Sequence, residues 1–67
     1  MRLTVYEVSS GDILGTIVTN RSMTLDGALR IIGFEYQYWE QHQTEGWSND
    51  NGETIYDSSD IETEADE

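Results

Sequence analysis

The clearest chemical pattern in this chain is a set of carboxylates near its C-terminal end. Asp60, Glu62, Glu64 and Asp66 occupy every second position, so an extended strand would project all four from one face. At a rise of roughly 3.3 Å per residue, neighbouring carboxylates would stand about 6.6 Å apart, near twice the ~3.4 Å phosphate spacing of one DNA strand. Such a row would imitate alternate phosphates. A flexible acidic terminus fits the same pattern, and the sequence leaves both interpretations open.

Catalytic and metal-binding patterns are much weaker. The segment Asn49-Asp50-Asn51-Gly52 has the glycine of a calcium-binding loop, but that register puts Trp47 and Ser58 where carboxylates are needed. His42 is the single imidazole, and no Gly-x-Ser-x-Gly elbow accompanies it. There is no Cys to serve as nucleophile, metal ligand or disulfide partner. We therefore expect a protein that is not an enzyme and has no metal and no cofactor.

The charge is divided unevenly along the chain. Its 67 residues carry 14 acids, three Arg and no Lys, for a net charge of −11. Residues 1–34 hold three acids and three bases, whereas residues 35–67 hold eleven acids and no basic residue except His42. Adaptation to high salt would act on the whole surface and does not explain this division. Because nucleic acids and anionic membranes are bound chiefly through Lys and Arg, we expect no direct binding to either.

The first half predicts a hairpin followed by a helix. Residues 2–8 alternate as a strand does, residues 13–19 are rich in β-branched side chains, and a turn separates them. Gly15 inside the second strand indicates a bulge or a close approach by another element. A helix is predicted from residue 25 to residue 32, capped by Thr24 and ended by Gly33, with an apolar stripe that packs on the hairpin.

The second half predicts further strands and a turn. Phe34, Tyr36 and Tyr38 alternate, which favours a strand over residues 34–41 rather than a helix. Asn51-Gly52 is typical of a two-residue type I′ turn, which would set Trp47 opposite Tyr56 and Asp50 opposite Glu53. The two facing acids would repel each other.

These elements predict one α+β domain over residues 1–57. The N-terminal hairpin and one or two later strands would form a small antiparallel sheet covered by one short helix. Residues 58–67 are predicted to be an acidic, flexible tail, because Ile61 is the last large aliphatic residue. Without a membrane-spanning stretch or a secretory pattern, the cytoplasm is the expected compartment.

The aromatic residues have two interpretations. Most of them are expected to complete a core that has few aliphatic side chains. The others would be exposed anchors of a protein interface, where Trp and Tyr are enriched. The set consists of Tyr36, Tyr38, Trp39, Trp47 and Tyr56.

In size, acidity and hairpin-helix pattern, the whole chain resembles the small inhibitors that phages and mobile elements make against bacterial defence nucleases, including anti-CRISPR proteins and other DNA mimics. Residues 19–29 also look like a segment found in small proteins of bacterial mobile elements. The resemblance is one of type, and no family motif assigns a role to any residue. It implies a bacterial host cell and a partner with a basic nucleic-acid channel, such as a Cas effector.

The function expected from these features is non-catalytic inhibition by an acidic surface that occupies a basic nucleic-acid-binding groove. The alternative is a small accessory module of a mobile element that binds through its aromatics and needs the acids only for solubility. The oligomeric state is not predicted. The expected partner-binding residues are, first, Glu40, Glu45, Asp50, Glu53 and Asp57 around the predicted turn and, second, Asp60, Glu62 and Glu64 near the terminus.

Overall fold

The N-terminal hairpin forms as its alternating apolar residues predict. In the computed structural model, which describes residues 1–66 with side chains to Ala65, β1 (Arg2–Glu7) pairs antiparallel with β2 (Ile13–Val18). Gly11 adopts a φ of +77° in the connection between them, a conformation that glycine adopts without steric cost. This reverses the chain within a few residues.

Gly15 has both of the roles that its position in β2 predicts. The β1–β2 register shifts where Val5 opposes Gly15 and Tyr6 opposes Ile13, which leaves Leu14 as the extra residue of a bulge. A Cβ on Gly15 would stand 3.0 Å from the Ile32 side chain. The bulge and the close approach are therefore both confirmed.

The one α-helix among the described residues, α1 (Leu25–Ile31), begins and ends at the predicted signals. The Thr24 side chain accepts a hydrogen bond from a backbone N–H of the first turn, as an N-cap does. After the helix, Gly33 has a φ of +99°, and the Phe34 N–H donates to the Leu29 carbonyl at 2.9 Å. This is a Schellman ending, which satisfies carbonyls of the last turn.

The C-terminal segment differs from the predicted flexible tail. Ser58–Asp60 form a short 3-10 helix, η1, and Ile61–Asp66 form strand β5, which pairs antiparallel with β1. The tail prediction is wrong for these residues because Ile61 is buried at 1% exposure and β1 offers a free edge for pairing. The three-stranded sheet has the order β2-β1-β5. Residue 67 lies outside the described residues.

A second, two-stranded sheet is formed by β3 (Glu35–Trp39) and β4 (Thr44–Ser48). The strand predicted over residues 34–41 is therefore confirmed. In β3 the side chains alternate between two faces, and Trp39 is buried, with its Nε1 donating to the Gly46 carbonyl at 3.2 Å.

The turn predicted at Asn51-Gly52 is present in the loop after β4. Asn51 and Gly52 have φ values of +62° and +87°, the signs that a type I′ turn requires. Trp47 and Tyr56 exchange two backbone hydrogen bonds of 2.8 Å, so they face each other in the predicted register. Trp47 and Tyr56 form an isolated bridge and not a continuous strand pairing, because side-chain hydrogen bonds hold the loop between these two residues.

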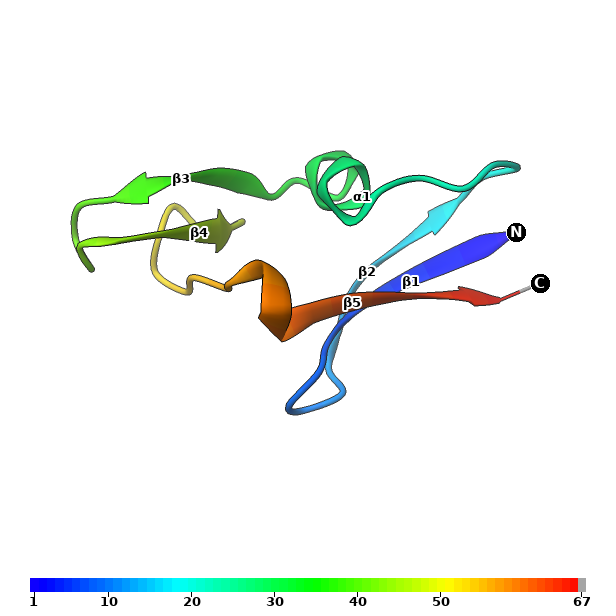
Figure 1. Ribbon diagram of the computed structural model, residues 1–67, viewed down its shortest axis with the longest axis horizontal. Helices are drawn as coiled ribbons and strands as arrows, with labels where there is room; N and C mark the ends of the chain where they lie inside the picture. The colour runs from blue at the N-terminus through cyan, green and yellow to red at the C-terminus, as the bar shows by residue number, and fades with distance from the viewer. Residues whose placement is uncertain (67) are drawn as a thin grey trace.

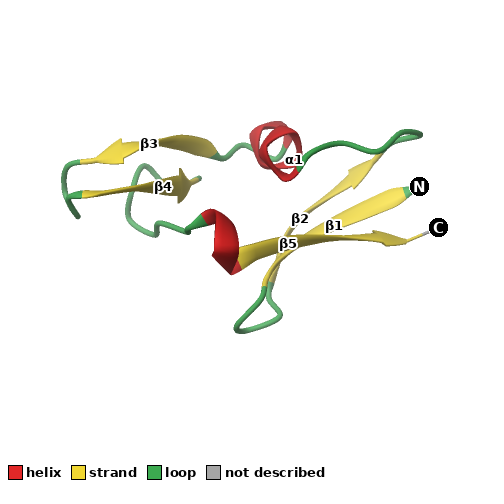
Figure 2. Ribbon diagram, in the orientation of Figure 1, coloured by secondary structure: helices red, strands yellow, loops and turns green. Residues whose placement is uncertain are grey.

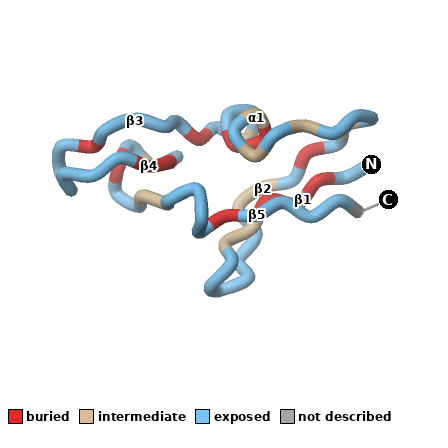
Figure 3. The backbone as a smooth tube through the Cα atoms, viewed as in Figure 1, coloured by how far each residue is buried: buried red, intermediate tan, exposed pale blue. Residues whose placement is uncertain are grey.

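The helix covers one face of the three-stranded sheet, and the β3–β4 sheet extends the molecule to one side (Figures 1 and 2). The molecule measures 39 × 21 × 17 Å. Buried positions are concentrated where helix, sheet and β4 meet (Figure 3). No helix within residues 1–66 is long and apolar enough to cross a membrane. The core residues are Leu3, Val5, Ile17, Ala28, Leu29, Phe34, Trp47 and Ile61.

Candidate functional site

Acidic segments run along the whole length of the molecule. The β3–β4 sheet lies at one end of the long axis, and β5 runs toward the opposite end (Figure 1). Residues 35–66, which belong to the half of the chain that holds all of the excess negative charge, therefore extend along an axis of 39 Å. The predicted partner-binding acids fall into three groups, according to what their carboxylates contact.

Asp50 belongs to the first group, whose carboxylates accept hydrogen bonds from backbone N–H groups. Its Oδ1 accepts the Ser48 hydroxyl at 2.7 Å and the Thr54 backbone N–H at 2.9 Å. The hydrogen bond from Thr54, followed by that from Ser48, lowers the pKa of Asp50 below its usual value. The expected repulsion by Glu53 is not among the causes of this shift. Asp50 therefore organises the loop, and its carboxylate is already committed to internal partners.

Asp57 and Asp60 belong to the same group. The Asp57 Oδ1 accepts the Ser58 N–H at 2.8 Å, and the Asp60 Oδ2 accepts the Asp57 N–H at 3.0 Å. The Asp57 side chain also accepts the Asp60 backbone N–H, and this bond with the reciprocal bond from the Asp57 N–H to Asp60 forms a capping box that stabilises η1. Because the chain turns at Asp60, this carboxylate is not part of the extended row. The Asp66 side chain lies outside the described residues.

The second group consists of acids beside a tyrosine hydroxyl, and it includes the two remaining members of the row, Glu62 and Glu64, which we call the β5 acidic row. They oppose Tyr6 and Thr4 of β1, on the sheet face away from the helix, and both are exposed. The Tyr6 hydroxyl donates to Glu62 Oε2 at 3.0 Å. This bond is the largest cause of a raised Tyr6 pKa, to which the charges of both glutamates add.

Glu45, the last member of the second group, lies beside an exposed tyrosine of β3. The Tyr36 hydroxyl donates to Glu45 Oε2 at 3.3 Å. The negative charge of Glu45 is the largest cause of a raised Tyr36 pKa, and the more distant charges of Asp57 and Asp26 raise it further. The charges of three acids, from β4, α1 and the N-cap of η1, therefore act on this hydroxyl.

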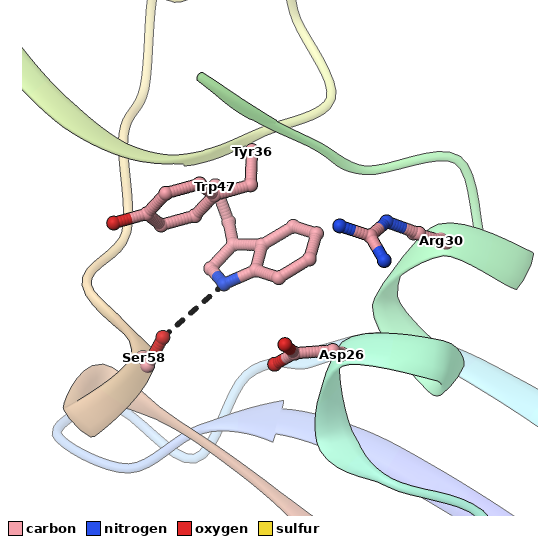
Figure 4. A pocket seen from close by; sticks show the side chains of 5 residues that line it. All are labelled: Asp26, Arg30, Tyr36, Trp47 and Ser58. Carbon is pink, nitrogen blue, oxygen red and sulfur yellow. Dashed lines mark hydrogen bonds between the residues drawn. The ribbon is translucent and has the colours of Figure 1, made fainter. Parts of the chain in front are cut away.

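Below Tyr36 lies a hollow of about 260 Å³ (Figure 4). Its floor is Trp47, which packs edge-to-face against Tyr36 and lies under the Arg30 guanidinium, 5.4 Å from the ring centroid. The Trp47 Nε1 donates to the Ser58 hydroxyl at 3.3 Å. Asp26 faces the same hollow from α1 (Figure 4). With one acid and one base beside each other, the hollow has no net preference for an anion or a cation.

Glu40 and Glu53 form the third group. Both are exposed, and neither carboxylate accepts a hydrogen bond from any residue in the described part of the chain. Glu40 lies in the turn between β3 and β4, and Glu53 lines a shallow hollow of about 230 Å³ with His42 and Thr44. The five acids predicted around the turn thus differ in what their carboxylates contact.

Sequence reasoning did not single out Tyr6, which bonds Glu62, or Asp26, which lines the hollow beside Tyr36. Both lie in the charge-neutral half, and each reaches these neighbours only through long-range packing, so no local signal marked them. The capping role of Asp57 and Asp60 did have a local signal, because an acidic N-cap with a second acid three residues later is a capping-box pattern.

No group of three or more potential metal ligands occurs within residues 1–66. No family model, curated protein or solved structure matches this chain. The function therefore has to be argued from the acidic surface itself.

Proposed function

We propose that this protein is a non-catalytic inhibitor that binds the basic nucleic-acid-binding surface of a bacterial defence nuclease, such as a Cas effector, and that its acids take the place of phosphates. The proposal rests on the β5 acidic row. Glu62 and Glu64 stand two residues apart on one face of a paired strand, which corresponds to a spacing of about 6.6 Å.

The row is held in place before any partner arrives. β5 is anchored by the buried Ile61 and by its ladder with β1, and the Tyr6 hydroxyl bonds Glu62 directly. Carboxylates fixed in this way lose less conformational entropy on binding than those of a mobile tail. The strand therefore supports phosphate imitation better than a disordered terminus would.

The net charge of the whole molecule also supports phosphate imitation. A net charge of −11 is carried by a molecule whose longest axis is 39 Å. A charge of this size exceeds the ~2 to 8 of a typical small domain and opposes folding through self-repulsion. A partner that needs the charge explains why it is retained, and a host cytoplasm is where such a partner would be met.

The direct test is competition with nucleic acid. The protein is used to capture partners from bacterial lysate at two salt concentrations, and each captured protein is then assayed for displacement of DNA or RNA. We expect a nucleic-acid-binding partner that leaves the bait as salt rises and that loses its nucleic acid when the inhibitor binds. Binding without displacement would refute mimicry.

A second candidate function is supported by one observation. Tyr36 and Tyr38 are 46% and 56% exposed on β3, which is unusual for large aromatic side chains and typical of interface anchors. In an accessory module that binds through them, Tyr38→Ser would abolish binding while neutralised glutamates would leave it intact. The two functions therefore predict opposite responses to the same two variants.

A further inference from the structure

The two edges of the three-stranded sheet differ in chemistry. β5 forms one edge and carries Glu62 and Glu64, and charged side chains of this kind protect a strand edge from pairing with another chain. β2 forms the other edge, and its six residues include no charged side chain and no proline. Ile13 and Val18 at its two ends are 67% and 84% exposed. Apart from the bulge at Leu14, β2 therefore lacks the usual protection of an edge strand, and residues 16–18 lie beyond that bulge in regular register with β1.

The direction of the free backbone groups follows from the ladder with β1. The Thr19 N–H donates to the Met1 carbonyl at 3.0 Å. Since bonding alternates along an antiparallel pair, Ile17 also bonds toward β1, whereas Thr16 and Val18 direct their N–H and C=O groups away from the sheet. Two residues thus offer four backbone hydrogen-bonding groups at this edge.

We propose that two copies of this chain pair through β2, antiparallel, around a two-fold axis at Ile17. Thr16 of each copy would then oppose Val18 of the other, and the two pairs would exchange four backbone hydrogen bonds. The opposed side chains are β-branched, which suits cross-strand packing. The result is a closed pair with one continuous six-stranded sheet.

The charge distribution favours pairing of two copies at β2 over pairing at β5. Pairing through β5 would set two acidic rows about 4.8 Å apart, which like-charge repulsion opposes. Pairing through β2 places the two β5 strands at the outer edges, five strand spacings or roughly 24 Å apart. That distance exceeds the ~8 Å screening length at physiological salt, so the two rows barely repel each other.

This inference goes beyond the proposed function and does not depend on it. Binding to a basic partner weakens as salt rises, whereas pairing of two copies that each carry −11 should strengthen. The two processes are therefore separated by the sign of their salt dependence. Because one strand edge buries less than the ~800 Å² per partner of a standard interface, we expect a dimer that dissociates on dilution.

Sedimentation equilibrium tests the pairing, over concentrations from about 1 to about 500 µM at about 0.15 and 0.5 M salt. The variant is Val18→Lys, which puts a charge on the edge, and the matched control is Val8→Lys, at an exposed valine outside β2. Both substitutions lower the net negative charge equally. We expect the wild type and Val8→Lys to approach two copies per particle, and Val18→Lys to require at least tenfold higher concentration.

A wild-type chain that stays monomeric throughout would overturn the proposal, and so would dimerisation that Val18→Lys leaves unchanged. Particles that grow beyond two copies would indicate open-ended pairing of β2 with β5 and would also overturn it. Amide hydrogen exchange of the wild type gives a readout that needs no variant. Exchange at Thr16 and Val18 should slow as concentration rises, while a rate independent of concentration would contradict pairing at this edge.

Discussion

The hydroxyl of Tyr6 on β1 donates a hydrogen bond of 3.0 Å to the carboxylate of Glu62 on β5. The two residues are 56 positions apart in the chain and directly opposite each other in the ladder. This contact fixes one carboxylate of the β5 acidic row on the open face of the sheet. It also links the charge-neutral half of the chain to the acidic half.

The raised pKa values of three tyrosines predict that the protein loses stability at high pH. Tyr6, Tyr36 and Tyr56 all have a pKa raised above the usual 10.0, chiefly by the Glu62 hydrogen bond, by the charge of Glu45 and by burial, respectively. Above pH 10 the unfolded chain therefore holds fewer protons than the folded chain, and the free energy of unfolding falls as pH rises. Below that pH the contribution is fully present.

Urea unfolding at a series of pH values from about 8 to about 11.5 measures this effect. Tyr6→Phe removes one of the shifted groups and should flatten the decline. The matched control is Tyr38→Phe, since the Tyr38 hydroxyl donates to no carboxylate among the described residues. An equal slope for the two variants would contradict the role assigned to Glu62.

The lowered pKa of Asp50 predicts that the protein loses stability in acid. Its pKa is lowered by the hydrogen bonds from Thr54 and Ser48, so its contribution is present above the unfolded-state pKa and is lost as pH falls through the folded-state value. Asp50→Ala should lower the melting temperature at pH 7 and reduce the further loss between pH 4 and pH 2. Glu53→Ala, which removes a neighbouring acid without such bonds, should leave both measurements near wild type.

Ile61 should be essential for the C-terminal strand. Ile61→Ala removes a side chain that is 1% exposed in the core, and such a change costs about 2 to 5 kcal/mol. Ile31→Ala, at a position 62% exposed, is the control and should cost well under 1 kcal/mol. Denaturant titration distinguishes the two, and an equally small cost for Ile61→Ala would mean that β5 is not anchored.

Two glycines should respond differently to a methyl group. A Cβ on Gly46 would lie 2.7 Å from the Tyr56 carbonyl oxygen, which belongs to the backbone bridge with Trp47. The three atoms nearest to a Cβ on Gly15 would all belong to the Ile32 side chain, which a second substitution can shorten. We expect Gly46→Ala to cost at least ~1 to 3 kcal/mol. We also expect Gly15→Ala to be partly rescued by Ile32→Val, and a melting temperature for the double variant no higher than for Gly15→Ala would contradict that contact.

Much of the fold could be predicted from local signals. Thr24 and Gly33 mark the helix ends, and Gly15 marks the bulge. Asn51-Gly52 sets the Trp47–Tyr56 register. Each of these signals acts on residues that are close to it in the sequence. β5 could not be predicted in the same way. β5 is anchored because Ile61 packs in the core with residues of β1 and α1. No sequence pattern within residues 58–67 indicates that contact.

The site was predicted less well for a related reason. Sequence spacing identified Glu62 and Glu64 as neighbours on one face, since period-2 alternation is a property of the strand itself. It could not show that Asp50 and Asp60 use their carboxylates to bind backbone N–H groups. Counting acids therefore does not distinguish the carboxylates that bind the backbone from those that accept no such hydrogen bond.

The measurement that tests the central claim most directly compares the affinity of two double variants for a captured nucleic-acid-binding partner. Glu62→Gln with Glu64→Gln neutralises the β5 acidic row and keeps an acceptor for Tyr6, while Glu40→Gln with Glu53→Gln removes the same charge from exposed positions elsewhere. Our account predicts a loss of roughly tenfold for the first variant, greatest at low salt, and a loss of no more than about threefold for the second. Equal losses, or none, would show that the row does not stand in for phosphates.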